Sequence, residues 1–196
     1  MFIDSETMGN ARRFLALPDL GAALPTTAGS PSDRGRVTLI VSRTEGGVRT
    51  TPDRARLTRE GGVPDDAWGR KEGAKLEGQI TVMETPIARL MANGQPLTLF
   101  GDNLFLELDL SIANLPPGSR VAIGSAVLEV TTKPHRGCSK FSGRFGADAL
   151  RFTATPEGRA RRFRGVYMYV VAAGDVSPGD AVEVLERAQF VEDATV

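Results

Sequence analysis

The chain has 196 residues, enough for one domain with a substantial buried core. Its 24 Lys and Arg side chains balance its 24 Asp and Glu side chains, which argues against binding to nucleic acid or to an anionic membrane surface. A single cysteine excludes an internal disulfide and any Cys-x-x-Cys pair for zinc or dithiol chemistry.

Residues 1–35 are predicted to form an N-terminal arm or linker. A short amphipathic piece at 11–17 is followed by a stretch rich in Gly, Pro, Ser and Thr, which disfavours regular structure. A single domain is expected to occupy residues 36–196. It begins with a run of β-branched residues at 36–42 that predicts a strand.

The middle of the chain is predicted to contain long loops, short strands and one helix. Residues 44–75 are expected to form loops with a short strand at 55–58, and the next strand is expected at 79–83. Thr85 and Pro86 provide an N-cap and a proline at the first helical position, and Gly94 provides a stop. A helix of about two turns is therefore expected between them.

The rest of the chain is predicted to be rich in strands. They are expected at residues 97–100, 104–110, 120–132, 164–171 and 181–186, with turns at 116–119, 124–125 and 177–180. Residues 141–150 are expected to form a short helix or irregular structure. This spacing of short strands and turns predicts a mostly β fold, a β-barrel with a few short inserted helices.

The only cysteine, Cys138, and the only histidine, His135, lie three positions apart in a glycine-containing segment. Four cations surround them, at Lys133, Arg136, Lys140 and Arg144. Nearby positive charge favours the thiolate, which is the nucleophilic and metal-binding form of cysteine. Cys138 is therefore the candidate for chemistry, against the alternative that it is a small buried hydrophobic side chain. The sequence leaves open whether His135 faces Cys138 or points away from it.

Positive charge is concentrated between residues 131 and 165. This segment has nine Lys or Arg and two acidic residues, which leaves fifteen basic and twenty-two acidic residues elsewhere. Such asymmetry within a neutral chain favours a small anionic ligand over a long polyanion. The run Arg159-Ala160-Arg161-Arg162 is by itself typical of a solvated basic face.

Several short motifs occur in a characteristic order between about residue 37 and residue 184. They are Gly101-Asp102-Asn103-Leu104 before Leu108-Asp109-Leu110-Ser111, Pro116-Pro117-Gly118 with Ile123-Gly124, Cys138-Ser139-Lys140-Phe141 with Arg144-Phe145-Gly146, and Gly165-Val166-Tyr167 with Pro178-Gly179-Asp180. In this order the chain resembles the MOSC domain family, named for the C-terminal domain of molybdenum cofactor sulfurase. The resemblance implies a strand-rich barrel with one reactive cysteine, which falls on Cys138.

The resemblance also implies a ligand. It points to molybdenum cofactor of the molybdopterin type or a related sulfurated species, with Cys138 as a sulfur carrier through a persulfide or as a metal ligand. The phosphate of this small anionic cofactor would be bound by Lys133, Arg136, Lys140 and Arg144, and the polar rim of the site would be formed by Asp102 and Asn103.

Partners and reactions follow from the same resemblance. A cysteine desulfurase or redox partner proteins are the implied partners, and the family carries an association with pyridoxal phosphate binding. If the protein is an enzyme, the implied reaction is sulfur transfer or the molybdenum-dependent reduction of N-hydroxylated substrates.

One segment departs from the family pattern. Many relatives carry Gly-Asp-Arg followed by His or Trp where this chain reads Asp65-Asp66-Ala67-Trp68. The absent arginine removes a guanidinium group that could clamp an anion with two hydrogen bonds. Two alternatives therefore stay open: a non-catalytic ligand- or partner-binding barrel with a degenerate site, and a reductase of N-hydroxylated compounds that works with separate redox partners. A cysteine peroxidase or thiol reductase is disfavoured because the chain has no second cysteine to resolve a sulfenic acid.

The expected location is the cytoplasm, with no membrane contact. The N-terminus lacks the basic start and apolar run of a signal peptide, and no apolar stretch approaches the roughly 20 residues that span a bilayer. A single cysteine is also typical of a reducing compartment.

Overall fold

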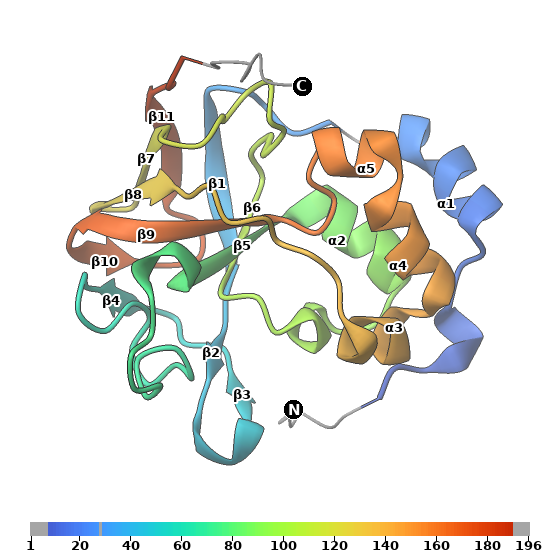
Figure 1. The fold of residues 1–196 in the computed structure, drawn as a ribbon, viewed down its shortest axis with the longest axis horizontal. Coiled ribbons are helices and arrows are strands. Elements are labelled where there is room, and N and C mark those ends of the chain that lie inside the picture. The colour runs from blue at the N-terminus through green and yellow to red at the C-terminus, as the bar shows by residue number, and fades with distance from the viewer. Residues whose placement is uncertain (1–7, 28, 190–196) are drawn as a thin grey trace.

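The computed structural model describes residues 8–27 and 29–189. In this part of the chain, seven strands close into a barrel, and the helices gather on one side of it (Figure 1). The strand order is β1 (Arg34–Ile40), β11 (Ala181–Glu186), β7 (Arg120–Ile123), β8 (Ala126–Val130), β9 (Val166–Ala172), β5 (Ile80–Glu84) and β6 (Leu104–Leu106). Neighbours pair antiparallel except β5 and β6, which are parallel. The β-barrel with short inserted helices predicted from the sequence is confirmed.

Two small sheets lie outside the barrel. One pairs β2 (Ser42–Arg43) with β3 (Arg49–Thr50), and the other pairs β4 (Ala55–Leu57) with β10 (Gly174–Val176). The helices are α1 (Leu17–Ala23), α2 (Thr85–Ala92), α3 (Ser139–Phe145), α4 (Ala147–Ala154) and α5 (Pro156–Ala160). Short 3-10 helices are η1 (Ala11–Arg13), η2 (Leu24–Thr26), η3 (Glu45–Gly47), η4 (Leu76–Gly78) and η5 (Leu97–Phe100). No helix among the described residues is long and apolar enough to cross a membrane.

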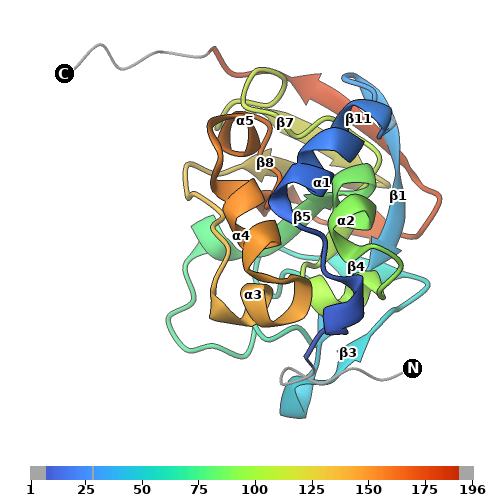
Figure 2. The same ribbon diagram turned by 90° about the vertical axis from the view of Figure 1, so that its right-hand side faces the viewer.

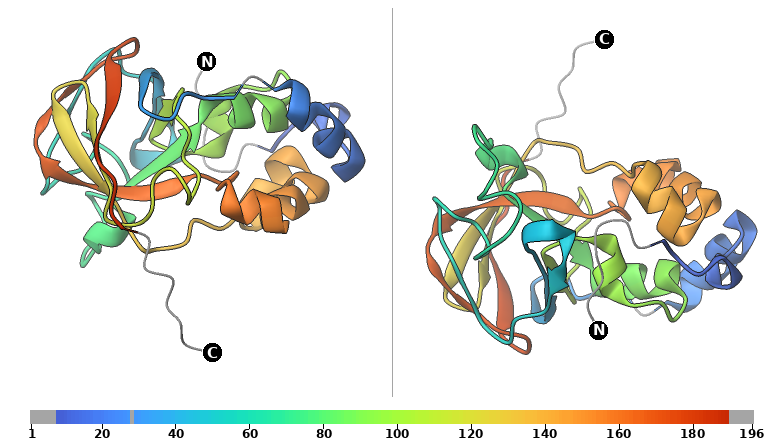
Figure 3. Two further views of the ribbon diagram at one scale, coloured as in Figure 1. Left: turned by 90° about the horizontal axis from the view of Figure 1, so that it is seen from above. Right: turned by 90° about the horizontal axis from the view of Figure 1, so that it is seen from below.

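The parallel strands β5 and β6 separate two hydrophobic cores. Successive side chains of a strand point to opposite faces, so each strand contributes to both cores. Val82 and Leu104 belong to the core inside the barrel, whereas Met83 and Phe105 belong to the core between the barrel and the helices. Figure 3 shows the barrel and the helices side by side from above and below. The site described below lies where these two halves meet.

Helix α2 connects β5 to β6 and agrees with its sequence prediction. Pro86 lies in its first turn, where a missing backbone N–H costs nothing. The helix ends at Asn93, whose φ of 44° is left-handed, and Gly94 follows with a φ of 82°. Both residue types tolerate this conformation, so the stop expected at Gly94 is confirmed.

The N-terminal segment is more than the arm or linker that the sequence suggested. Helix α1 packs against α4 and α2, as Figure 2 shows. Leu20 is completely buried in the helical core, and Leu24 is buried beside it. The backbone N–H of Leu17 donates to the Asp148 carboxylate at 3.2 Å, which ties α1 to α4. The four-residue spacing of the two leucines is helical, and composition alone obscured it.

Two strand predictions were wrong in detail. Residues 97–100 form the 3-10 helix η5, because Leu99 and Phe100 are both buried against helices rather than on alternating faces. The strand expected at 104–110 ends at Leu106. The expected turn at 124–125 is confirmed as the connection of the β7–β8 hairpin. The helical structure expected at 141–150 extends further, through α3, α4 and α5 to Ala160.

Candidate functional site

Residues 131–138, here called the strap, run from the end of β8 to the start of α3 (Figure 1). The strap leaves the barrel at Thr131, whose hydroxyl donates to the carbonyl of Glu77 at 3.0 Å. It ends at Cys138, which is the residue before α3. The strap therefore carries both His135 and Cys138 from the barrel to the helices.

Cys138 is exposed, and its backbone is extended with φ of −128° and ψ of 179°. Its side chain does not cap α3, so the thiol has no structural task there. The helix that follows is fixed by aromatic packing, since the rings of Phe145 and Phe100 stack with centroids 4.0 Å apart. The alternative of a buried hydrophobic cysteine is therefore wrong: Cys138 is exposed at the residue that precedes α3.

A buried ion pair lies beneath the strap. Asp102 is 1% exposed, and its Oδ2 accepts a hydrogen bond from Arg164 Nη1 at 2.7 Å. Its other oxygen, Oδ1, lies 3.6 Å from His135 Nε2. The ring of His135 packs on that of Tyr167 with centroids 4.4 Å apart, and Lys133 Nζ lies 5.0 Å from the Tyr167 ring centre. His135 thus points inward, toward Asp102 and Tyr167.

Burial controls the protonation of this cluster. Burial lowers the pKa of His135 well below its ordinary value, and the charges of Arg164, Arg43 and Lys133 lower it further, so the imidazole is neutral near pH 7. Burial raises the pKa of Asp102 against the opposing charge of Arg164. Burial also raises the pKa of the Tyr167 hydroxyl, with a contribution from Asp102, so this phenol stays protonated.

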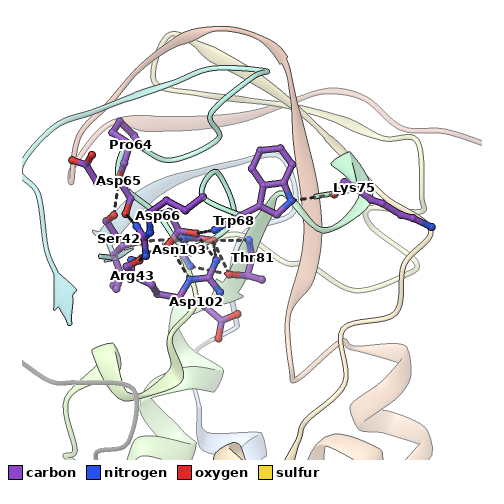
Figure 4. A network of polar contacts seen from close by, with 12 residues as sticks. Ser42, Arg43, Pro64, Asp65, Asp66, Trp68, Lys75, Thr81, Asp102 and Asn103 are labelled. Carbon is purple, nitrogen blue, oxygen red and sulfur yellow. Dashed lines mark hydrogen bonds and ion pairs between the residues drawn. The ribbon is translucent and has the colours of Figure 1, made fainter. Parts of the chain in front are cut away.

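The segment at residues 65–68 takes part in a network of polar contacts, shown in Figure 4. Asp66 is 2% exposed and accepts hydrogen bonds from the backbone N–H of Trp68 at 3.0 Å and from Asn103 Nδ2 at 2.9 Å. Its two oxygens also accept from Arg43 Nε at 2.9 Å and Nη2 at 2.6 Å. Asn103 in turn accepts from the backbone N–H of Thr81 at 3.1 Å. Figure 4 shows the Asp102 side chain pointing away from this network.

The Asp66 to Arg43 pair is a bidentate ion pair. Burial acts to raise the pKa of Asp66, but the hydrogen bonds and charge of Arg43 outweigh it and lower the pKa below its ordinary value. Arg43 is still 29% exposed and is close enough to influence Asp102 and His135 electrostatically. Arg43, which the sequence analysis missed, thus directs its guanidinium at the carboxylate of Asp66.

A cavity of about 590 Å³ lies between the strap and the helices α4 and α5. Its lining includes five cations: Lys133, Arg136, Arg159, Arg162 and Arg164. His135 and three threonines add polar groups, and the apolar part of the wall is formed by Ile112, Pro117, Leu150, Ala154 and Val166, among others. None of the lining residues is acidic, and Cys138 itself is not among them, although its neighbour Gly137 is.

The predicted site residues fall into three groups. Lys133 and Arg136 line the cavity, whereas Cys138 lies outside its lining. Lys140 is exposed on α3, outside the cavity lining. Arg144 is buried and donates to the carbonyl of Leu99 at 3.1 Å, so it supports the helical core rather than the cavity.

Asp102 and Asn103 do not form the polar rim that the sequence suggested. Both are almost completely buried, at 1% and 0% exposure. Asn103 bonds Asp66 and Thr81, and its Nδ2 also donates to the carbonyl of Val41 at 3.2 Å. Both are buried by their contacts in the interior, Asp102 with Arg164 and Asn103 with Asp66 and Thr81.

Two arginines that the sequence analysis did not single out, Arg43 and Arg164, belong to the site region. Arg43 is the last residue of β2, and Arg164 lies two residues before β9, so a search for cations at strand ends would have found both. The expectation that residues 159–162 form a solvated basic face is only partly right. Arg161 pairs with Glu157 at 3.4 Å, whereas Arg162 turns inward and donates to the carbonyl of Leu115 at 2.6 Å.

Metal ligands are sparse in this region. No group of three or more His, Cys, Asp or Glu side chains with metal-binding geometry occurs in the part of the chain that the structure describes.

Comparison with known proteins places this geometry in a family. The solved structure of the YuaD protein from Bacillus subtilis is similar with a TM-score of 0.56 at 18% identity, covering 77% of this chain and 95% of that one. YiiM from Escherichia coli is similar with a TM-score of 0.54 at 21% identity, covering 80% and 72%. These likenesses show the fold. A search of curated proteins gave no match.

The sequence matches the family of the MOSC domain over residues 82–183. This match covers more than half of the chain and includes the buried Asp102, the strap with Cys138, and Tyr167. The expected resemblance is confirmed, and the chain belongs to the MOSC domain family.

Proposed function

We propose that the protein binds molybdenum cofactor or a related sulfurated species, and that Cys138 carries the transferred sulfur or ligates the metal. The observation that carries this proposal is an exposed thiol at the end of the strap, beside Lys133 and Arg136, which have no carboxylate partner among the described residues. A cysteine side chain beside cations suits a ligand that combines sulfur or a soft metal with an anionic group.

The residues present fit such a group. The cavity volume of about 590 Å³ falls within the range of about 300 to 1,000 Å³ that is typical of small-molecule sites. Two buried nitrogens in this region, His135 Nδ1 and Arg164 Nε, have no hydrogen-bond partner among the described residues. Such atoms are costly in a dry interior, and a polar ligand or water would relieve that cost.

The chain contributes binding, orientation and a nucleophile. When bound, molybdenum cofactor supplies a soft metal held by sulfur ligands. Lys133 and Arg136 would hold its anionic group, and Tyr167 offers a protonated hydroxyl near the Cys138 thiol. The buried ion pair between Asp102 Oδ2 and Arg164 Nη1 lies beneath the strap and would orient the groups around it.

The exposure of Cys138 favours the sulfur-carrier role, because a donor protein must reach the thiol. In that role the Cys138 thiolate attacks the outer sulfur of a donor persulfide. The bond between the two donor sulfurs breaks, the donor leaves as a thiolate, and Cys138 becomes the persulfide.

The proposal is tested with protein purified from cells that make molybdenum cofactor. Molybdenum and pterin content are measured together with the mass of the peptide that contains Cys138. We expect wild-type protein to contain pterin with molybdenum, or an additional sulfur on Cys138. Cys138→Ser is expected to lose the additional sulfur and to fold normally, because the thiol is exposed and does not cap α3.

Arg151→Gln is the matched control. Arg151 is an exposed arginine on α4 that pairs with Asp148 and does not line the cavity. This variant should contain as much molybdenum, pterin and added sulfur on Cys138 as the wild type. Wild-type protein without pterin, molybdenum or added sulfur would refute the proposal and would favour a non-catalytic binding barrel.

A further inference from the structure

Between its two ends, the strap has little support from its own backbone. At the barrel end, the backbone N–H of Thr131 donates to the carbonyl of Tyr167 at 2.9 Å. At the other end, the carbonyl of Cys138 accepts from the N–H of Ser142 in α3 at 3.1 Å. Residues 132–137 make no backbone-to-backbone hydrogen bond with the residues that the structure describes. Contacts of side chains therefore decide where this stretch lies.

Two residues of this stretch face inward. Among residues 132–138, only His135 and Gly137 are not exposed. The His135 side chain is 5% exposed and packs on the ring of Tyr167 in β9, with 4.4 Å between the ring centroids and 44° between the ring planes. Because Gly137 has no side chain, the imidazole of His135 is the group that reaches from the strap into the interior.

Gly137 brings the strap into close contact with α4. A Cβ atom at this position would overlap Leu150 Cδ1, and glycine is the residue type that avoids the overlap. Leu150 itself packs against the helical core. The strap therefore touches the barrel through His135 and the helices through Gly137, the residue immediately before Cys138.

These two contacts have different roles. Glycine permits the close approach to Leu150, but without a side chain it does not secure it. A buried ring packed on another ring favours one arrangement of the strap over alternatives in which the ring is exposed. His135 is therefore the residue of this stretch whose contacts secure the strap.

We infer that His135 is a positioning residue for Cys138: its ring, packed on Tyr167, holds the strap against the barrel and so fixes where the thiol lies beside the cavity. The inference rests on the proposed function in one respect, that Cys138 is the residue that holds the ligand or its sulfur. A reacting group held in one place does not have to be ordered at each encounter, which favours reaction and binding.

The order of the strap can be measured directly. Cys138 is the only cysteine and is exposed, so a nitroxide methanethiosulfonate reagent labels it alone. Electron paramagnetic resonance spectra of labelled, cofactor-free protein then report the mobility of the end of the strap. His135→Ala removes the ring, so the rotational correlation time of the label should fall by about twofold or more. His135→Phe keeps a ring against Tyr167 and should restore a spectrum close to that of the wild type.

Val182→Ala is the matched control for a general loss of stability. Val182 is completely buried in the barrel core on β11, whose neighbours in the barrel are β1 and β7. Its truncation lowers the free energy of unfolding without removing a contact of the strap, so the label should be as ordered as in the wild type. Thermal unfolding checks that each variant is folded at the temperature of measurement. If His135→Ala does not fold, His135→Gln, which also lacks the ring, takes its place.

The same variants, purified without label from cells that make molybdenum cofactor, connect order with function. Where the wild type carries pterin, molybdenum or added sulfur on Cys138, His135→Ala should carry about fivefold less, and His135→Phe should carry nearly the wild-type amount.

The inference is overturned if the label in His135→Ala is as ordered as in the wild type, or if His135→Phe or Val182→Ala is as mobile as His135→Ala. Full wild-type content in folded His135→Ala would overturn it as well. Wild-type protein that carries none of these ligands refutes the proposed function instead. In that case the spectra of cofactor-free protein still decide whether His135 orders the strap.

Discussion

Cys138 and His135 lie three positions apart on the strap, yet their surroundings are opposite. The thiol is exposed, whereas the imidazole side chain is 5% exposed and packs on Tyr167. Contacts with Asp102 and Tyr167 hold the imidazole inward, whereas the thiol has no such contact. The two residues are therefore a solvent-facing nucleophile and a buried structural group, not a paired thiolate and imidazolium.

The neutral state of His135 predicts how stability depends on pH. The groups that face it are Asp102, Arg164, Arg43, Lys133 and Tyr167. Its folded pKa lies below the unfolded value of about 6.5, so its contribution to stability is present above that pH and is lost as the pH falls. Binding of this one proton can change the free energy of unfolding by at most about 1.4 kcal/mol per pH unit.

His135→Gln removes this titration. Chemical denaturation of the wild type and the variant at several pH values between about 7.5 and about 5 measures how the free energy of unfolding of each depends on pH. We expect the free energy of unfolding to fall more steeply with acidification in the wild type than in the variant. Asp102 is present in both proteins, so its own titration largely cancels. Parallel curves would show that His135 has the same pKa in the folded and unfolded states and would contradict this account.

At the scale of elements, the loop at residues 64–75 is held against neighbouring segments by the side chain of Asp66. Asp66 connects this loop to β2 through Arg43 and to the turn after η5 through Asn103. These contacts join residues 23 and 37 positions apart. The loop thus holds Arg43 where its charge reaches Asp102 and His135.

Asp66→Asn should therefore destabilise the protein. The substitution removes the charge opposite Arg43 and places an amide donor against a guanidinium, so we expect a loss of about 3 kcal/mol in the free energy of unfolding. Asp65→Asn is the matched control, because Asp65 is exposed with a φ of 58° that asparagine tolerates. Its effect should stay within about 0.5 kcal/mol. Equal stability of the two variants in denaturant titrations would contradict this role for Asp66.

The whole molecule shows which features local sequence patterns determine. The barrel was predictable because its strands carry β-branched and alternating apolar residues between clear turns. Residues 97–100 were mispredicted because tertiary contacts of Leu99 and Phe100 overrode a short apolar pattern. Helix α1 was missed because glycine and proline around Leu20 masked its buried face.

The candidate site was predictable only in part, for the same physical reason. Cys138 stands out by its residue type, so the strap could be identified from the sequence. The Arg164 to Asp102 pair joins residues 62 positions apart, and Arg162 reaches Leu115 across 47. No local sequence pattern encodes such contacts. For this reason the inward orientation of Arg162 and Arg164 could not be predicted from the sequence.

The central claim is that Cys138 is the residue at which the ligand or its sulfur is held. Alkylation of Cys138 by an iodoacetamide reagent, followed by peptide mass spectrometry, measures the fraction of free thiol. Protein freshly purified from cells that make molybdenum cofactor is compared with protein from cells that cannot make it. We expect alkylation of Cys138 to be reduced in the first preparation and restored after treatment with a reductant that releases bound sulfur or after removal of the cofactor. Complete and equal alkylation of Cys138 in both preparations would contradict the account.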